Sequence, residues 1–372
     1  MKISILLPYK ENYSPEYPGA VSLFINSTSK ISNYNSDITV FGNTNLKKKF
    51  SQNYVNIPLN KNFLFKSQSK EYVNKFIALH DGKKVDIIEI HNRPNYVYLV
   101  KKIDTKIVLY FHNDPLSMIG SKMKQERILL LSYCKKIIFN SEWSKKRFLK
   151  DINTIYHKSS RLEVIHQSIN RENVDIKKKQ NLITFVGKLN SAKGYDLFGS
   201  AVIRILNQYK NWRAIVVGDE PREKLEFKHK NLQLLGFQDH KKVLEIFKKT
   251  SIAVACSRWE EPFGRTSLEA SSRGCAVIIS NRGGLPETIT NGIIIRNLNE
   301  DNLFKSINNL IKDKKKRKSL QERSLKNFYL TNDYISKKID NYRFSLINKV
   351  QINTSKKNIN ENLKILHVTN FN

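Results

Sequence analysis

Short runs of apolar residues alternate with longer amphipathic segments from one end of the chain to the other. Each run is rich in Ile, Val, Leu and Phe and has the length of a buried strand. Within the runs apolar residues follow one another directly, which is typical of parallel strands covered on both faces. Strands are therefore predicted at 2–8, 37–42, 85–90, 106–112, 136–141, 161–167, 182–187, 213–219, 232–236, 252–257, 276–280 and 292–296.

Helical periodicity fills the intervals between these runs, most clearly at 195–208, 240–250 and 266–273. Strands that alternate with helices indicate an α/β fold, and these strands are too numerous for one small sheet. The predicted fold class is thus α/β, with two doubly wound, Rossmann-like domains that face a central cleft. The predicted domains are 1–170 and 171–335, with the boundary in the polar, basic segment 170–181.

The C-terminal part of the chain changes character. A long basic helical stretch is predicted at 319–349, and a helix at 336–350 that overlaps it can cross back to the first domain. Residues 351–362 are polar and are interpreted as a linker within the tail 351–372. The last segment, LKILHVTNFN (363–372), resembles the apolar N-terminal strand. One hypothesis makes it the first strand of a further α/β unit, and the alternative makes it an edge strand or loose tail of the same fold.

Size and composition are those of a folded protein. The 372 residues are 40% hydrophobic and 10% aromatic, which argues against a disordered chain. The three cysteines, Cys134, Cys256 and Cys275, show neither a C-x-x-C pair nor a metal-binding spacing and lie in or beside apolar segments. Buried, reduced thiols are expected, which indicates the cytoplasm. No apolar run approaches the ~20 residues that a membrane-spanning helix needs.

The chain is strongly basic, with 65 Lys and Arg residues against 33 Asp and Glu residues and a formal net charge of +32. A compositional bias, attraction to anionic lipid headgroups and binding of nucleic acid are the possible explanations. Nucleic acid is the weakest, because no finger, helix-turn-helix or RNA-binding aromatic set accompanies the charge. We therefore expect no nucleic-acid partner and a cytoplasmic protein that can lie peripherally on the anionic inner-membrane surface.

The segment 258–287 carries the most informative motif. Glu261 and Glu269 stand on either side of a Pro-Phe-Gly turn (262–264) that starts a predicted helix, and a second glycine turn follows at 283–284. A helix N-terminus presents unpaired N–H groups to an anion. Ionised carboxylates accept hydrogen bonds from hydroxyl groups. The combination suits a nucleotide diphosphate that carries a sugar.

Two lysines upstream of this motif can supply positive charge. Gly187 and Lys188 end a predicted strand, and Lys193 precedes a helix. Cations next to a diphosphate stabilise a departing nucleotide, a role that a metal ion has elsewhere. Since no D-x-D motif occurs in the chain, the prediction is a site without a metal or other cofactor. The alternative is that both are ordinary surface lysines in a lysine-rich protein.

With these residues in view, the chain resembles the retaining family 4 glycosyltransferases (glycosyl transferases group 1), which have the GT-B fold. The segment around Glu261 and Glu269 is similar to their E-x7-E donor-binding motif, and GGLPE (283–287) is similar to the loop that follows it. The resemblance is specific across 182–290 and looser in the first half of the chain. Lys188 departs from the family pattern, in which Arg is more frequent.

The resemblance implies roles on the donor side. Glu261 would bind hydroxyls of the donor sugar, and Glu269 would hold the ribose hydroxyls. Gly236 and Phe237 would belong to the loop that cradles the nucleobase. Arg265 stands where an aliphatic residue is frequent in the family. The residues that would meet the sugar and the diphosphate are Pro262, Phe263, Gly264, Arg265, Thr266 and Ser267.

In the first half, His112 ends a predicted strand and resembles the family histidine beside the donor sugar. That histidine orients the sugar and stabilises developing charge; a packed strand-end histidine is the alternative. Where the family commonly has a Gly-Gly loop, this chain has Gly followed by Ala20, a departure from the pattern. The residues expected to line the acceptor side of the cleft are Gly19, His91, Asn92, Arg93 and Asn113.

The activity implied by the resemblance is transfer of a sugar from a UDP-, GDP- or ADP-sugar to a hydroxyl of a cell-envelope glycan or glycolipid, such as lipopolysaccharide core. Transfer would retain the configuration of the anomeric carbon, as in a metal-independent hexosyltransferase of the EC 2.4 class. The catalytic candidates are His112, Glu261, Lys188 and Lys193. Another GT-B enzyme, such as a nucleotide-sugar epimerase, and a basic nucleic-acid-binding protein are the alternatives.

Overall fold

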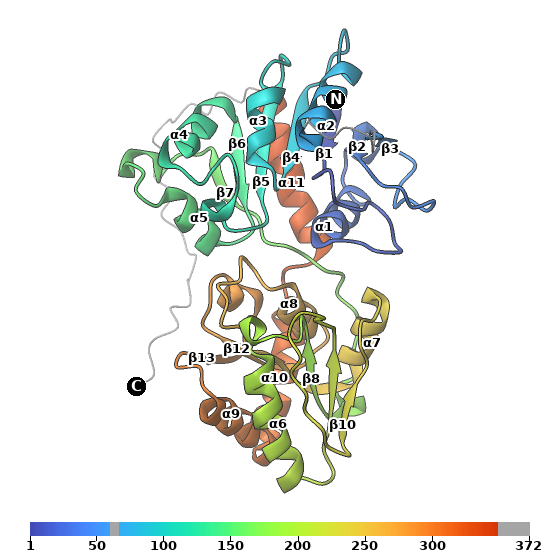
Figure 1. The fold of residues 1–372 in the computed structure, drawn as a ribbon, viewed down its shortest axis with the longest axis vertical. Helices are drawn as coiled ribbons and strands as arrows, with labels where there is room; N and C mark the ends of the chain where they lie inside the picture. Colours follow the sequence, from blue (N-terminus) through green and yellow to red (C-terminus); the bar gives the residue numbers. More distant parts are fainter. Residues whose placement is uncertain (60–66, 349–372) are drawn as a thin grey trace, which may run out of the picture.

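The computed structural model describes residues 1–59 and 67–348, which form two stacked α/β domains (Figure 1). Each domain is built on one sheet of parallel strands, with helices on both faces. The predicted fold class, two Rossmann-like domains, is therefore confirmed.

The N-terminal sheet has seven strands in the order β3-β2-β1-β4-β5-β6-β7. Its strands are β1 (Ile3–Leu6), β2 (Ile38–Gly42), β3 (Tyr54–Asn56), β4 (Ile87–His91), β5 (Lys106–Phe111), β6 (Lys136–Phe139) and β7 (Leu162–Val164). The helices of this domain are α1 (Ala20–Ser29), α2 (Gln68–Leu79), α3 (Pro94–Val100), α4 (Lys124–Tyr133), α5 (Glu142–Leu149) and the late helix α11 (Asn332–Ile347). Helices α2 to α5 cover one face, and α1 and α11 cover the other.

The C-terminal sheet has six strands in the order β10-β9-β8-β11-β12-β13. Its strands are β8 (Gln180–Val186), β9 (Arg213–Val217), β10 (Leu232–Leu234), β11 (Thr250–Ala255), β12 (Ala276–Ser280) and β13 (Gly292–Ile295). Its helices are α6 (Tyr195–Gln208), α7 (His240–Lys249), α8 (Arg265–Ser272), α9 (Glu300–Lys312) and α10 (Lys314–Lys326). Helices α6 and α9 pack on one face, and α7 and α8 pack on the other.

The apolar pattern predicted the strands well. Every predicted strand is present, and α6 has the bounds that the periodicity predicted. Within the described residues the pattern missed β3, because its sequence Tyr-Val-Asn carries a single aliphatic side chain. A short edge strand contributes little to the core and so leaves little trace in an apolar pattern.

The single long helix predicted at 319–349 is wrong. Helix α10 ends at Lys326, and α11 begins only at Asn332. Between them, Phe328 and Leu330 are buried in the N-terminal core, which an uninterrupted helix would not permit. Thr331 then caps α11, because its side chain accepts a hydrogen bond from the backbone N–H of the third helical residue.

The break lets the chain return to the first domain. The backbone N–H of Ile169 donates to the carbonyl of Leu330 at 3.2 Å, so the two segments that cross between the domains run side by side. Helix α11 then packs beside α1 in the N-terminal domain (Figure 1). The hydroxyl of Ser336 on α11 donates to the carbonyl of Thr28 on α1 at 2.9 Å.

Residues 349–372 lie outside the described part of the chain, and with them the predicted linker 351–362 and the predicted strand 363–372. Among the described residues, no helix combines the length and the apolar character needed to cross a membrane. The three cysteines are buried and free, as predicted.

Candidate functional site

A cavity of about 210 Å³ opens at the carboxyl ends of β8 and β11. These strands are neighbours in the sheet, although β9 and β10 lie between them in the sequence. The cavity therefore lies at the topological switch point, where open α/β sheets bind their ligands. Its lining consists of Phe185, Val186, Gly187, Lys193, Ala255, Ser257, Glu261, Gly264, Arg265, Thr266 and Leu285.

The turn before α8 brings the helix N-terminus to this cavity. Gly264 has φ +107°, in the left-handed region that glycine tolerates, and a Cβ there would collide with Leu285. Phe263 is buried, and its ring lies 5.6 Å from that of His166, which anchors the turn against the N-terminal domain. The first amides of α8 have no intrahelical acceptor and can bind an anion.

Glu261, rather than its neighbour Glu260, reaches the cavity. Glu260 accepts hydrogen bonds from the backbone N–H of Gly283 at 2.6 Å and from Arg282 at 3.2 Å, so it holds the second glycine turn. A Cβ on Gly283 would collide with the backbone of Glu261, which means that glycine is needed for this close packing. The structure thus separates the two adjacent carboxylates into a cavity-lining residue and a loop-holding residue.

Lys193 forms an ion pair with Glu261 inside the cavity. Asn190 caps the short 3₁₀ turn that carries the lysine, since its side chain accepts from the Lys193 N–H at 3.0 Å. The next residue, Gly194, has φ +74°, and a Cβ there would collide with the carbonyl of Cys256. The close packing of this turn on the strand end brings the ammonium group of Lys193 to the carboxylate.

Glu269 is buried, and one of its carboxylate oxygens accepts two hydrogen bonds. Its Oε1 accepts from Arg265 Nε at 2.8 Å and from His240 Nε2 at 2.8 Å. Burial would raise the pKa of Glu269, but the hydrogen bond from His240 and the charge of Arg265 outweigh it and hold this pKa below its ordinary value. Glu269 is therefore an ionised acceptor whose Oε1 is already engaged.

The sequence did not single out His240, the first residue of α7. Its only sequence signal is its place just after the loop that begins with Gly236 and Phe237. Arg265 stands where the family frequently has an aliphatic residue, and the structure shows what this arginine contacts. Its Nη1 is buried and has no hydrogen-bond partner among the described residues, while its Nε holds Glu269.

Several predicted donor-side residues do not line the cavity. Lys188 is exposed, and Phe237 is 64% exposed. Gly236 has φ +64°, and its carbonyl accepts from the Gly218 N–H at 2.9 Å, so it joins two strand-end loops. The Ser267 hydroxyl donates a hydrogen bond to the carbonyl of Gly264 and lies 2.7 Å from the hydroxyl of Thr288.

The N-terminal domain meets the turn before α8 at Ser141, the N-cap of α5. Its hydroxyl donates to the carbonyl of Pro262 at 2.6 Å. Nearby, the Glu287 carboxylate accepts from the backbone N–H groups of Glu142 at 2.7 Å and Trp143 at 3.1 Å, and it contacts His166 Nε2 at 3.0 Å. Glu287, the last residue of GGLPE, thus joins the domains, a role that its local sequence did not reveal.

His112 follows β5 and is 7% exposed. Its Nε2 lies 3.0 Å from His91 Nδ1, and its backbone N–H donates to Asn92 Oδ1 at 3.2 Å. Burial is the main cause that holds the pKa of His112 well below its ordinary value, and the charge of the neighbouring His91 is a smaller one. The ring of His112 is therefore neutral near pH 7.

The expected acceptor-side group is only partly at the surface. His91, the last residue of β4, and Asn92, which follows it, are buried next to His112 at the edge of the sheet, so neither lies at the exposed acceptor side where the prediction placed them. Arg93 is half-buried and donates to the carbonyl of Asn92 at 2.7 Å, whereas Asn113 is exposed. Gly19 packs against the Glu11 carboxylate, which accepts from an amide of α1.

The cavity has the groups that a nucleotide diphosphate with a sugar requires. Lys193, Arg265 and the start of α8 offer positive charge and N–H donors, and Glu261 offers an acceptor for hydroxyls. Glu269 is a second acceptor, but it is buried behind Arg265 and does not line the cavity. Within residues 1–59 and 67–348, no group of three or more His, Cys, Asp or Glu side chains is placed to hold a metal ion.

Comparison with known proteins agrees with this chemistry. Residues 166–327, which contain the lining residues of the cavity, match the profile of the family "Glycosyl transferases group 1". Spore coat protein SA of Bacillus subtilis (strain 168) is 22% identical over 358 residues, covering 86% of this chain and 92% of that protein. The lipopolysaccharide core biosynthesis mannosyltransferase LpcC of Rhizobium leguminosarum bv. viciae is 32% identical over 123 residues, 30% of this chain and 35% of that protein.

Solved structures share the fold of the whole chain. Anabaena HepE in complex with UDP has a TM-score of 0.71 at 17% identity, covering 93% of this chain and 100% of that chain. Sucrose-phosphate synthase from Thermosynechococcus elongatus has a TM-score of 0.72 at 14% identity, covering 93% and 99%. Residues 166–327 therefore match the profile of glycosyl transferases group 1, and the chain as a whole has the GT-B fold of these solved structures.

Proposed function

We propose that the protein is a retaining glycosyltransferase that moves a sugar from a nucleotide-sugar to a hydroxyl of a cell-envelope glycan or glycolipid. The observation that carries this proposal is the cavity at the switch point, in which Glu261 and Lys193 pair beside the N-terminus of α8. An acceptor for sugar hydroxyls and donors for a diphosphate stand there side by side.

A UDP-sugar is the donor that the comparisons favour. HepE, which shares the fold, is described in complex with UDP and with UDP-glucose. In this chain Glu269 Oε1 is held by Arg265 and His240, so Oε2 is the oxygen left to accept from a ribose hydroxyl. Lys193 and the free Nη1 of Arg265 would then bind the diphosphate, and Glu261 would bind hydroxyls of the sugar.

The reaction breaks the bond between the anomeric carbon and the β-phosphate oxygen and forms a bond from that carbon to the acceptor oxygen. In a front-face route, the leaving phosphate oxygen takes the proton of the acceptor hydroxyl, so the configuration is retained. Negative charge grows on the diphosphate in the oxocarbenium-like transition state. Lys193, Arg265 and the α8 amides supply the compensating charge without a metal ion in this proposal.

The acceptor side of the proposal rests on what two similar proteins are named. One relative is named a lipopolysaccharide core mannosyltransferase, and a structural neighbour, WaaB, is described as a lipopolysaccharide outer core galactosyltransferase. A peripheral position on an anionic membrane fits the exposed apolar side chains that stand among lysines near α4 and α5. The most exposed of these are Ile119 (82%) and Ile155 (77%).

Donor binding tests the proposal directly. Thermal unfolding should be measured with UDP-, GDP- and ADP-sugars, because a ligand that binds only the folded state raises the unfolding temperature. We expect stabilisation by one nucleotide class, and transfer of its sugar to a glycan acceptor with retained configuration. Absence of stabilisation by all three classes would contradict the proposal, and conversion of the sugar without an acceptor would indicate an epimerase.

A further inference from the structure

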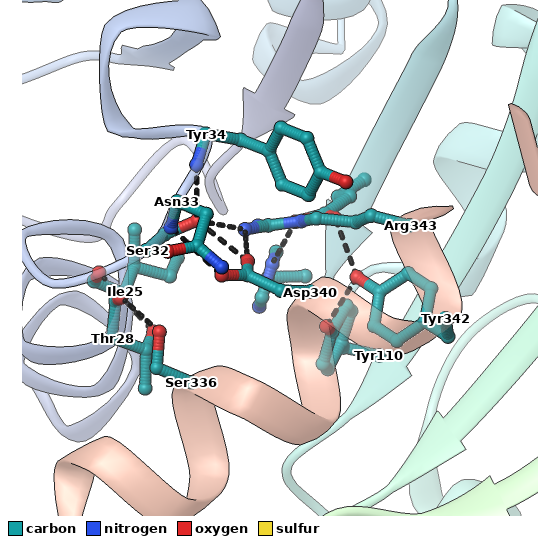
Figure 2. A network of polar contacts seen from close by, with 12 residues as sticks. Ile25, Thr28, Ser32, Asn33, Tyr34, Tyr110, Ser336, Asp340, Tyr342 and Arg343 are labelled. Carbon is teal, nitrogen blue, oxygen red and sulfur yellow. Dashed lines mark hydrogen bonds and ion pairs between the residues drawn. The ribbon is translucent and has the colours of Figure 1, made fainter. Parts of the chain in front are cut away.

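A chain of buried polar side chains runs from α11 to His112. Figure 2 shows its α11 end, where Asp340, Tyr342 and Arg343 point toward α1 and the N-terminal sheet. Arg343 Nη1 donates to Ser32 Oγ at 3.2 Å and to Asp340 Oδ1 at 3.3 Å. The hydroxyls of Tyr342 and Tyr110 lie 2.5 Å apart.

Glu89, on β4, is the central charge of this chain. It is 1% exposed and receives two parallel hydrogen bonds from Arg343, from Nε at 2.8 Å and from Nη2 at 2.8 Å. The hydroxyl of Tyr342 also donates to it. Burial would raise the pKa of Glu89, but the charge and the hydrogen bonds of Arg343, together with the smaller influence of His91, outweigh burial and hold this pKa far below its ordinary value. Glu89 is thus a fixed anion beneath the strand ends.

His91 lies between Glu89 and His112. Its Nε2 is 4.0 Å from Glu89 Oε2, an ion-pair distance too long for a hydrogen bond, and its Nδ1 is 3.0 Å from His112 Nε2. Its ring stacks on that of Tyr110 at 4.2 Å and 11°, which fixes its orientation. Burial lowers the pKa of His91, although Glu89 partly offsets this, so both imidazoles are neutral near pH 7.

Two neutral imidazoles that share one hydrogen bond need one donor and one acceptor. If His91 donated from Nδ1, its Nε2 lone pair would face the Glu89 carboxylate, and His112 would bury an N–H at Nδ1. No described residue accepts from that Nδ1. If His112 donates from Nε2 instead, the His91 Nε2–H points its positive end at Glu89, and His112 Nδ1 keeps a lone pair. Both arrangements leave one ring N–H and one ring lone pair without a hydrogen-bond partner among the described residues, so the charge of Glu89 decides between them. A carboxylate 4.0 Å away attracts the His91 Nε2–H and repels a lone pair at the same atom.

We propose that Glu89, acting through His91, sets the tautomer of His112, with the proton on Nε2 and the lone pair on Nδ1. Because Nε2 is occupied by His91, Nδ1 is the ring nitrogen left to accept a hydrogen bond from a ligand hydroxyl; in the structure it is buried and has no hydrogen-bond partner among the described residues. That ligand is the donor sugar, a step that rests on the proposed function. Glu89, His91 and Arg343 are then positioning residues, and α11 takes part in preparing the site.

Histidine-selective ¹⁵N labelling and long-range ¹H–¹⁵N spectra test the tautomer, with the His112 signals assigned from a His112→Gln variant. We expect a protonated Nε2 and an unprotonated Nδ1 on His112 in the wild type. Glu89→Gln keeps the shape but removes the charge, so the tautomer should become mixed. The kcat should then fall about tenfold, as for a lost hydrogen bond in the transition state, with donor affinity within about twofold.

Asp340→Asn is the matched control. It also removes a buried acidic partner of Arg343, but this partner does not face His91, so the His112 spectrum and the kcat should stay as in the wild type. If Glu89→Gln does not fold, the double variant Glu89→Gln/Arg343→Gln removes both charges of the ion pair together. The same mixed tautomer and the same fall in kcat are expected for it. A protonated Nδ1 in the wild type, or an equal change in Asp340→Asn, would overturn the inference.

The spectra also separate this inference from the proposed function. If the tautomer behaves as expected while His112→Gln transfers sugar at the wild-type rate, the control by Glu89 stands and the role of His112 beside the sugar is wrong. If no nucleotide-sugar binds at all, the tautomer can still be read from the spectra of the free protein.

Discussion

The two sides of the site are built in opposite ways. On the C-terminal side, Glu261 and Arg265 come from one short stretch of sequence and line an open cavity together with Lys193, and the buried Glu269 lies four residues after its partner Arg265. On the N-terminal side, Glu89 and Arg343 are 254 residues apart and fully buried. The open side can exchange its ion pairs for a ligand, whereas the buried side keeps its partners and holds one imidazole in place.

The largest expected effect concerns the open side. Glu261→Gln should lower transfer about a thousandfold, because a charged acceptor at the reacting sugar is lost. Initial rates with saturating donor measure this loss. Glu260→Gln is the matched control, since that carboxylate holds the neighbouring loop and does not line the cavity, and it should keep most of the activity. An equal loss in both variants would mean that the loop, rather than Glu261, governs the reaction.

On the buried side, a substitution should lower the stability of the folded protein. Arg343→Met leaves the Glu89 carboxylate without its cation and should cost about 3–5 kcal/mol of unfolding free energy. Urea unfolding measures this change. Arg204→Met breaks an exposed pair with Glu300 and should cost less than about 1 kcal/mol. A similar loss of unfolding free energy for the two arginines would mean that the buried pair stabilises the fold no more than an exposed pair does.

Donor affinity should depend on the buried carboxylate of the motif. Glu269→Gln removes the charge that Arg265 and His240 orient, and UDP affinity should fall about tenfold to a hundredfold. Titration calorimetry with UDP measures it. Glu245→Gln, on the exposed face of α7, provides the control and should bind like the wild type. Unchanged affinity in Glu269→Gln would show that the ribose lies elsewhere.

The low pKa of His112 predicts a pH effect on stability. The unfolded chain takes up a proton below about pH 6.5 and the folded ring does not, so stability is lost as the pH falls through that range. Between pH 7.5 and 5.5 this residue should contribute about 1 kcal/mol of that loss. Urea unfolding of wild type and His112→Gln at both pH values measures the difference. Equal pH dependence in the two proteins would contradict a buried neutral ring.

The smallest expected effect separates the two candidate lysines. Lys188→Ala should change kcat/KM by less than about twofold, because its side chain is exposed and is not part of the cavity lining. Lys193→Ala, which removes the partner of Glu261, should lower kcat/KM about a hundredfold. A large loss for Lys188 would mean that the strand-end loop moves toward the diphosphate when donor binds.

Much of the fold follows from local pattern. Continuous apolar runs predicted the parallel strands, since burial on both faces leaves no room for polar positions. The helix predicted across 319–349 is wrong because Phe328 and Leu330 turn inward only when the N-terminal domain is present to receive them. The donor motif could likewise be predicted, because a glycine turn, a helix start and two carboxylates lie within one short segment.

The sequence by itself determined the two α/β domains and the chemistry of the segment around Glu261 and Glu269, because both depend on residues close together in the chain. Only the tertiary structure decided which cation meets Glu261, that Arg265 and His240 share Glu269, and that His91 faces His112 instead of an acceptor. Those pairings depend on the order of the strands, and the buried pair of Glu89 and Arg343 depends on the return of α11 to the first domain. A buried charge is stable only beside its partner, and the fold chooses that partner from a distant part of the sequence.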